Sequence, residues 1–332
     1  MRAFVTGATG LLGSNLVHAL LEHGHEVRGL VRSPEKAQRI FPDGKIELVT
    51  GNVRDVATFA ESLVGCDALF HTAAYFREYY QPGDHKAMLE KINVQGTIDL
   101  LIAAEKHGVK KAVHISSAGV IGRKPDGSRG DENTPPDEHA SSNLYFASKI
   151  QGELAISRFL KERSLPVTMV LPSWMWGPGD WAPTASGKLV LDFMKQKLPG
   201  VVDGGSSIVD VRDVAQATIS AAHLGKSGER YIVGGTYHDF ADILATLERV
   251  TGVPAPKREI PYALSLAVAA GAETWARLTG GTALVTLAGI RTLHAKNAVL
   301  SDKSISELSA AFRPFEETVR NEVEWFRSHR YL

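Results

Sequence analysis

Residues 3–13 read AFVTGATGLLG, a short apolar run followed by a loop with three glycines. The apolar run predicts a buried strand, and the leucines that recur after Gly13 predict an amphipathic helix. Between the two, Gly7 allows a tight turn, Gly10 allows a ligand to approach the backbone, and Gly13 allows close packing of helix on strand. Unpaired N–H groups at the start of such a helix favour a pyrophosphate. The pattern therefore predicts a dinucleotide-binding loop, whose candidate contacts are Gly7, Thr9, Gly10, Leu11, Leu12 and Gly13.

The rest of the chain repeats this alternation of apolar runs and amphipathic segments. Strands are expected at residues 3–5, 27–31, 46–49, 68–70, 112–115, 167–171 and 231–234. Helices are expected at residues 11–23, 56–63, 88–107 and 145–162. Such alternation predicts an α/β fold of the Rossmann type, a doubly wound parallel sheet with helices on both faces. Because the glycine motif lies inside it, a cofactor loop is favoured over a simple glycine turn.

The pattern changes after Leu171. Residues 172–206 are rich in Trp, Pro and Gly, and helical patterns dominate from about Tyr237. We therefore expect a Rossmann domain at residues 1–171 and about 207–235. A smaller, mostly helical C-terminal lobe for the substrate is expected at about 172–206 and 236–332. Residues 123–143 contain few apolar side chains, which predicts a long surface loop.

Composition disfavours several classes of protein. The 332 residues include 37 Lys and Arg and 37 Asp and Glu, and zero net charge argues against a nucleic-acid partner. Cys66 is the only cysteine, so no internal disulfide can form, which favours a reducing, cytoplasmic compartment. The longest weakly polar stretch, residues 261–272, is shorter than the roughly 20 residues of a membrane-spanning helix. No metal site is expected, because His18, His23 and His25 lie around a helix end and a turn.

The end of the second expected strand should contact the adenosine ribose. An NAD site usually has Asp or Glu there, about 20 residues beyond the glycine motif. Residues 27–33 read VRGLVRS instead. Arg32 supplies a fixed positive charge that suits a 2′-phosphate, so NADP(H) is preferred and NAD(H) stays possible. Lys36 or Arg39 would assist, and a solvated surface arginine is the alternative. Candidates to border the adenine, at the next strand end, are Asn52 and Val53.

A second group of candidates surrounds Tyr145 and Lys149. They are four residues apart in an expected helix, so both lie on one helix face. A free tyrosine has a pKa of about 10, too high for efficient proton transfer at neutral pH, and a neighbouring ammonium lowers it. Ser117 follows the strand expected at 112–115, at the sheet edge where ligands bind, and its hydroxyl can stabilise a developing oxyanion. Taken singly, an exposed helix pair and a turn serine remain the simpler interpretations.

Together these motifs resemble the extended short-chain dehydrogenase/reductase family, within the NAD-dependent epimerase/dehydratase superfamily. The resemblance rests on the TGxxGxxG loop, the Tyr145-x-x-x-Lys149 motif and Ser117. It implies hydride transfer between a nicotinamide and a carbonyl or carbinol carbon. In that scheme Tyr145 is the acid or base, Lys149 lowers its pKa and binds the nicotinamide ribose, and Ser117 holds the substrate oxygen. It also implies a homodimer formed through the helices at 88–107 and 145–162.

The resemblance extends to further positions, over residues 1 to about 215. Asn93 matches a family asparagine that supports the active site or the cofactor, and residues 71–74, HTAA, match the segment beside the dinucleotide. Pro172 and Ser173 match the segment that holds the nicotinamide amide. Cofactor contacts are therefore also expected from Thr72, Ala73, Ala74, Pro172 and Ser173, besides Tyr145 and Lys149.

The substrate class is the more open question, because the family includes nucleotide-sugar epimerases or dehydratases and carbonyl reductases of the dihydroflavonol-reductase type. Sugar-nucleotide members carry an Arg-Asp-aromatic stretch that residues 204–215, GGSSIVDVRDVA, lack. Aromatic side chains follow two strand ends, which favours an apolar or aromatic substrate, although lobe packing explains them equally well. We expect reduction of an aldehyde or ketone, with a nucleotide-sugar epimerase or dehydratase and a non-catalytic NADP(H) sensor as alternatives. The candidate pocket residues are Tyr75, Phe76, Tyr79, Trp174 and Trp176, with Ser117.

Overall fold

The computed structural model describes residues 1–76, 84–279 and 285–332. Its centre is the predicted sheet, with seven strands and every neighbouring pair parallel. In spatial order the strands are β10 (Arg230–Val233), β6 (Val167–Pro172), β5 (Lys111–Ile115), β4 (Ala68–His71), β1 (Arg2–Thr6), β2 (Glu26–Val31) and β3 (Glu47–Thr50). The order reverses direction between β1 and β4, and ligands of open α/β sheets bind at such a reversal, beyond the carboxyl ends of the strands.

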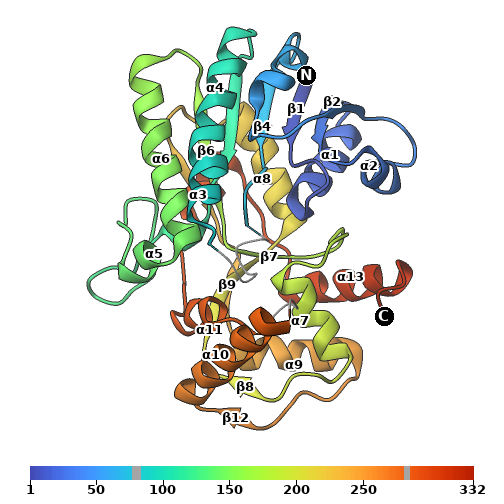
Figure 1. Cartoon of the computed structure of the whole chain (residues 1–332), viewed down its shortest axis with the longest axis vertical. Coiled ribbons are helices and arrows are strands. Elements are labelled where there is room, and N and C mark those ends of the chain that lie inside the picture. Colours follow the sequence, from blue (N-terminus) through green and yellow to red (C-terminus); the bar gives the residue numbers. More distant parts are fainter. Residues whose placement is uncertain (77–83, 280–284) are drawn as a thin grey trace.

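Helices cover both faces of this sheet, as the alternating pattern predicts (Figure 1). One face packs against α1 (Leu11–Glu22), α2 (Pro34–Ile40) and α8 (Val211–His223). The other packs against α4 (Gly96–Lys106) and α6 (Leu144–Glu162). The inner strands β1, β4, β5 and β6 are buried on both faces, which is why they read as nearly continuous apolar runs, whereas the edge strand β3 is partly exposed.

The helical stretch expected at residues 56–63 is present, but not as one continuous helix. Two short 3₁₀ helices, η1 (Val56–Thr58) and η2 (Ala60–Leu63), occupy this stretch. Phe59 between them leaves helical geometry, with φ −133°, and its ring stacks on Phe4 in the core, 6.1 Å between centroids. Burial of one large ring therefore overrides the helical periodicity.

The expected helix at residues 88–107 is present but irregular. It consists of α3 (Lys86–Leu89), a π-helical segment η4 (Glu90–Gln95) and α4. Directly after the π-helical segment, a Cβ on Gly96 would lie 2.6 Å from the carbonyl oxygen of Val53. The wide turn and the glycine let this helix approach the loop after β3 closely, and π-helical turns are frequent at functional sites.

The C-terminal half builds a smaller body below the sheet (Figure 1). It contains the strands β7 (Trp174–Trp176), β8 (Val201–Val202), β9 (Gly205–Asp210), β11 (Thr236–Asp239) and β12 (Glu259–Ile260), and the helices α7 (Ala185–Met194), α9 (Phe240–Thr251), α10 (Tyr262–Thr279), α11 (Leu287–His294) and α13 (Phe315–Ser328). The region is mostly helical as expected, although β11 forms where helical patterns were expected to begin. In the described ranges no helix combines the length and apolarity that crossing a membrane requires.

Two segments complete the fold. The long loop expected at residues 123–143 contains one short helix, α5 (Glu138–Ser142). Helix α12 (Asp302–Leu308) returns to the sheet, where Ser304 Oγ donates to the carbonyl oxygen of Ile232 over 2.6 Å. Where a cofactor-binding unit ends and a substrate-binding unit begins stays a prediction.

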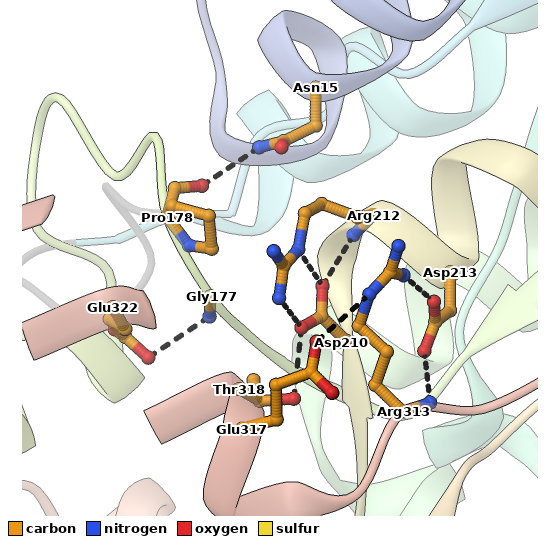
Figure 2. Close-up of polar contacts among 10 residues, drawn as sticks. All are labelled: Asn15, Gly177, Pro178, Asp210, Arg212, Asp213, Arg313, Glu317, Thr318 and Glu322. Carbon is orange, nitrogen blue, oxygen red and sulfur yellow. Dashed lines mark hydrogen bonds and ion pairs between the residues drawn. The ribbon is translucent and has the colours of Figure 1, made fainter. Parts of the chain in front are cut away.

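Polar contacts join α13 to the start of α8, and Figure 2 shows them. Asp213 accepts from the backbone N–H of Arg313 over 2.7 Å and pairs with its guanidinium. Thr318 Oγ1 donates to Asp210 Oδ2 over 2.9 Å. Glu322, fully buried, accepts from the backbone N–H of Gly177 over 3.0 Å. Side-chain carboxyl groups therefore fasten the C-terminal helix and the residues before it both to the start of α8 and to the loop after β7.

Candidate functional site

The glycine loop has the geometry that its sequence predicts. Gly7 has φ +68°, and a Cβ there would lie 2.9 Å from the backbone nitrogen of Ala73. A Cβ on Gly13 would lie 2.0 Å from the carbonyl oxygen of Gly7. Gly10 precedes α1 and no side chain caps that helix, so the N–H groups of its first turn are left for a ligand. The loop and Leu11 and Leu12 in that first turn fit a dinucleotide pyrophosphate.

The ends of β1 and β4 are tied together beside this loop. Thr72 Oγ1 donates to the carbonyl oxygen of Thr6 over 2.7 Å, and the N–H of Ala73 donates to Thr6 Oγ1 over 3.2 Å. On the other side of β5, Pro172 ends β6, and Ser173 Oγ donates to the carbonyl oxygen of Gly234 over 2.7 Å. Thr72, Ala73, Pro172 and Ser173 therefore all lie along the carboxyl edge of the sheet.

The adenosine end of the expected site is less enclosed. Arg32 is exposed at the end of β2, and Ser33 caps α2 by accepting from the N–H of Lys36 over 3.2 Å. The Ser33 hydroxyl itself donates to Glu35 over 2.8 Å, so its proton is not aimed at a phosphate in this state. After β3, Asn52 Oδ1 accepts from the N–H of Arg54 over 3.1 Å, while Val53 is buried.

The tyrosine and lysine predicted as partners lie in the first turns of α6. Asn143 caps this helix by accepting from the N–H groups of Tyr145 and Phe146 over 3.0 and 3.2 Å. Tyr145 is 8% exposed and Lys149 2%. The Lys149 ammonium nitrogen lies 5.9 Å from the centre of the Tyr145 ring and donates to the carbonyl oxygen of Ile115 over 2.8 Å. Helix α6 is thereby held against the carboxyl end of β5.

Ser117 stands at that same strand end. Its Oγ accepts from the N–H of Gly119 over 3.1 Å, which leaves its own proton for another acceptor. The structure thus brings Ser117, Tyr145 and Lys149 to one end of β5 and α6.

Asn93 lies in the π-helical segment and connects two elements. Its Oδ1 accepts from the N–H of Tyr75 over 2.8 Å, and its Nδ2 donates to the carbonyl oxygen of Tyr75 over 3.2 Å and to Ser148 Oγ over 3.0 Å. The segment after β4 is therefore fixed to α6 by one amide side chain, on the turn of helix beside Lys149.

The burial of Lys149 has electrostatic consequences. Desolvation lowers its pKa from 10.5 to about 8, and the charge of Glu153 acts in the opposite direction. Glu153 is tied down by the Ser116 hydroxyl and by the Arg230 Nε atom, 3.1 Å from Glu153 Oε2. Burial raises the pKa of Glu153, while Arg230, Ser116 and Lys149 lower it. Glu153 was not among the predicted residues, although its position four residues after Lys149 placed it on the same helix face.

Two buried histidines, also not predicted, lie close enough to Lys149 to be affected by its charge. Thr97 Oγ1 donates to the carbonyl oxygen of Asn93, so His71 Nε2, 3.0 Å from Thr97 Oγ1, is the donor in that contact. His71 Nδ1 lies 2.8 Å from Thr6 Oγ1 and accepts from it. This arrangement fixes a neutral ring, and burial followed by the charge of Lys149 lowers the pKa of His71 to about 3. His114, 5.2 Å away between ring centroids, has its pKa lowered by the same causes.

The structure places the aromatic residues expected in the substrate pocket in different surroundings. Phe76 packs on the Tyr145 ring, 4.7 Å between centroids, and Tyr75 Oη lies 2.8 Å from His85 Nδ1. Trp174 is half-buried, 5.2 Å from Trp176 between ring centroids. Trp176 is fully buried and packs edge-on against Phe315, so it belongs to the core of the lower body rather than to an accessible pocket wall. Tyr79 and its neighbour Tyr80 lie outside the described residues.

The family model and the relatives found by comparison with known proteins agree on one family. A model described as the NAD dependent epimerase/dehydratase family matches residues 3–234. A Synechocystis sp. protein provisionally named dihydroflavonol 4-reductase is 33% identical over 99% of this chain and 95% of its own length. Cinnamoyl-CoA reductase 1 from Oryza sativa is 29% identical over 74% of this chain and 75% of its own.

Solved structures agree on the fold. The crystal structure of gox2253 superposes with a TM-score of 0.83 and 35% identity, covering 99% of this chain and 98% of that one. UDP-glucuronic acid 4-epimerase from Bacillus cereus, solved in complex with NAD, superposes with a TM-score of 0.76 at 18% identity and covers 99% of each chain. The second likeness concerns the fold alone.

Proposed function

Because the chain belongs to the NAD-dependent epimerase/dehydratase family, we propose that it reduces an aldehyde or ketone with NADPH, with Tyr145 as the proton donor. Its relatives are named reductases and dehydrogenases, and the chain is an NAD(P)-dependent oxidoreductase that acts on CH–OH and C=O groups. The observation that carries the finer proposal is the buried pair Tyr145 and Lys149 at the carboxyl end of β5, beside Ser117.

Each of these side chains has a separate part in the proposed reaction. NADPH, when bound at the glycine loop, would supply a hydride for the carbonyl carbon. The Tyr145 hydroxyl gives its proton to the carbonyl oxygen, and the Lys149 cation favours the phenolate that remains. Ser117 donates to the same oxygen and stabilises the charge that develops on it. Lys149 is held for this task by Ile115, and Asn93 holds the neighbouring segment.

The preference for NADP(H) over NAD(H) rests on charge. Arg32 is the residue at the end of β2, where a carboxylate selects the free ribose of NAD. A guanidinium there suits a 2′-phosphate, with Lys36 or Arg39 of α2 assisting. Asn52 and Val53 would border the adenine, and Ala74 would lie beside the dinucleotide with Thr72 and Ala73.

The substrate proposed is an apolar or aromatic carbonyl compound. Phe76 packs on the Tyr145 ring and supplies an apolar surface at the proposed proton donor. Tyr75, which follows β4, and Trp174, which follows β6, are both partly exposed. A direct test incubates the protein with NADPH and a panel of aromatic aldehydes and ketones, and in parallel with UDP-sugars. Stoichiometric NADPH oxidation with carbonyl compounds supports reduction. Interconversion of sugar epimers without net NADPH loss would establish the epimerase alternative, and binding without turnover the sensor.

We also propose a homodimer in the cytoplasm. The faces of α4 and α6 expose Ile102, at 36%, and Leu154, at 46%, and large apolar side chains on adjacent helices suit an isologous interface. Light scattering after gel filtration tests the dimer, and a Leu154→Glu variant that remains dimeric would rule out this face.

A further inference from the structure

A cavity lies between α2 and the C-terminal end of α13, and Tyr145 is not among the residues that line it. Its volume is about 530 Å³, which falls in the range of small-molecule sites. Figure 1 shows α13 ending below α2, at the edge of the lower body. The cavity is lined by Lys36, Arg39, Ile40, Trp181, Ala182, His329, Arg330 and Tyr331. None of these residues belongs to the glycine loop or to the tyrosine and lysine pair.

The charges on this cavity are all of one sign. Lys36 and Arg39 come from one wall, on α2, and Arg330 comes from the other, with His329 beside it. The lining contains no Asp or Glu. The buried carboxylate of Asp180 accepts from the N–H and hydroxyl of Thr184, and burial followed by the charge of Asp180 raises the pKa of Tyr331. Arg39 and Arg330 are permanent cations that line one space from different elements, and an anion between them would interact favourably with both.

The backbone at Arg330 is strained. Helix α13 ends in a Schellman arrangement, in which the N–H of Arg330 donates to Arg327 and the N–H of Tyr331 donates to Phe326. Glycine usually takes the left-handed position of this motif, but here Arg330 has φ +62°. A non-glycine residue in this conformation is uncommon and costs free energy, so glycine at position 330 would relieve the strain.

Aromatic side chains form much of the remaining lining, together with Ile40 and Ala182. Trp181 meets the His329 ring edge-on at 4.8 Å, and His329 stacks on Trp325 at 4.3 Å. Tyr331 Oη donates to the carbonyl oxygen of Trp181 over 2.8 Å. Flat side chains held in this way present a preformed surface to a planar ring, which binds with little loss of side-chain entropy.

We propose that this cavity binds a phosphate monoester carried on a planar ring system. The phosphate would lie between Arg39 and Arg330, and the ring against Trp181 and His329. Two molecules offer this chemistry: a separate nucleotide, or the 2′-phosphorylated adenosine of NADP(H), in which case the proposal rests on the cofactor preference given above. Either ligand would join α2 of the sheet to the end of α13.

The test is calorimetric titration with 5′-AMP and with 2′-AMP, with and without saturating NADPH. Three variants are compared with the wild type: Arg330→Gly, Arg39→Ala, and Arg327→Ala as the control. Arg327 lies in the last turn of the same helix but does not line the cavity. Glycine suits the left-handed backbone at position 330, so Arg330→Gly should melt at the same temperature as the wild type or higher. It should nevertheless bind the nucleotide about 10-fold more weakly, as should Arg39→Ala, while Arg327→Ala changes affinity by less than about 2-fold.

The two sources are separated by competition. A separate nucleotide is identified if 5′-AMP still binds to NADPH-saturated protein and if Arg330→Gly weakens that binding. The cofactor's own phosphate is identified if the protein prefers 2′-AMP and NADPH displaces that nucleotide. The Arg330→Gly variant should then lose affinity for NADPH to the same extent. The proposal is overturned if Arg330→Gly binds both nucleotides as tightly as the wild type does. It is also overturned if the wild-type protein binds neither nucleotide. Nucleotide binding is measured without turnover, so the proposed nucleotide site can be supported even if the protein reduces none of the carbonyl compounds tested.

Discussion

The Lys149 ammonium nitrogen donates a hydrogen bond to the carbonyl oxygen of Ile115 across 2.8 Å, in the interior of the protein. Burial lowers its pKa from 10.5 to about 8, and the charged and titratable groups around it are Glu153 on α6, His71 on β4 and His114 on β5. Above pH 8 the lysine loses its charge, so we expect the rate of carbonyl reduction to decline there. Steady-state kinetics between pH 6 and 10 measure this, and a rate that stays constant to pH 9.5 would contradict it.

Protein stability should change in the opposite sense over the same window. Between about pH 8 and pH 10.5 the unfolded chain binds more protons at this lysine than the folded protein does, so this group makes the free energy of unfolding rise with pH. A Lys149→Met variant should lack this rise in urea denaturation. The two opposite trends together distinguish lysine titration from general alkaline unfolding.

Tyr145→Phe should remove the proton donor and little else. The ring contact with Phe76 survives in this variant, so we expect unchanged NADPH affinity and melting temperature, with kcat reduced about 10³-fold. Tyr231→Phe is a suitable control, because that hydroxyl contacts Glu307 on α12 rather than the proposed site. Full activity in Tyr145→Phe would remove this residue from the mechanism.

Glu153→Gln tests whether this carboxylate supports the lysine. Without its negative charge the pKa of Lys149 should fall further, which moves the alkaline decline in kcat to lower pH and leaves KM nearly constant. Loss of the ion pair with Arg230 should cost about 2 kcal/mol of unfolding free energy. Glu162→Gln, on the exposed end of the same helix, serves as control. An unshifted pH profile would limit Glu153 to a structural role.

Arg32→Glu should reverse the selection at the adenosine ribose. The new carboxylate repels a 2′-phosphate and accepts from a free ribose, so NADPH should bind about 100-fold more weakly and NADH no more weakly than before. Fluorescence titration with both cofactors measures the ratio, with Arg158→Glu on the exposed side of α6 as a charge-matched control. Equal losses for NADPH and NADH would refute the assigned role of Arg32.

Glu322→Gln should stabilise the protein at neutral pH. Burial, and then the charge of Asp180, raise the pKa of Glu322 well above 4.5, so the folded protein keeps this proton to a higher pH than the unfolded chain. The stability contributed by this group therefore falls as the pH rises above about 4.5.

An uncharged glutamine still accepts from Gly177 (Figure 2) and avoids that penalty, which is about 1.4 kcal/mol for each unit of pKa. Thermal unfolding from pH 5 to 8 should show a shallower decline for Glu322→Gln than for the wild type or for Glu324→Gln, an exposed position of the same helix. Identical pH profiles for all three proteins would show that Glu322 does not titrate in this range.

The parallel sheet and its glycine loop could be predicted because their signals are local. The inner strands are apolar over most of their length, and the covering helices show apolar faces. A loop that demands glycine at positions 7, 10 and 13 shows this in its residue types. The pair at Tyr145 and Lys149 was visible for the same reason, since helix geometry alone puts residues four apart on one face. The break at Phe59, which divides residues 56–63 into two short 3₁₀ helices, could not be predicted because the burial of Phe59 depends on Phe4, which is distant in the sequence.

The sequence by itself determined the fold class, the cofactor loop and the identity of the groups that could move a proton, because these follow from periodicity and side-chain chemistry. Only the tertiary structure decided that Glu153 reaches Ser116 and Arg230, that Trp176 is a core residue, and that α2 and the end of α13 enclose a cationic cavity. Each of these depends on contacts between residues far apart along the chain. Such contacts are set by how the whole molecule packs, which no local pattern records.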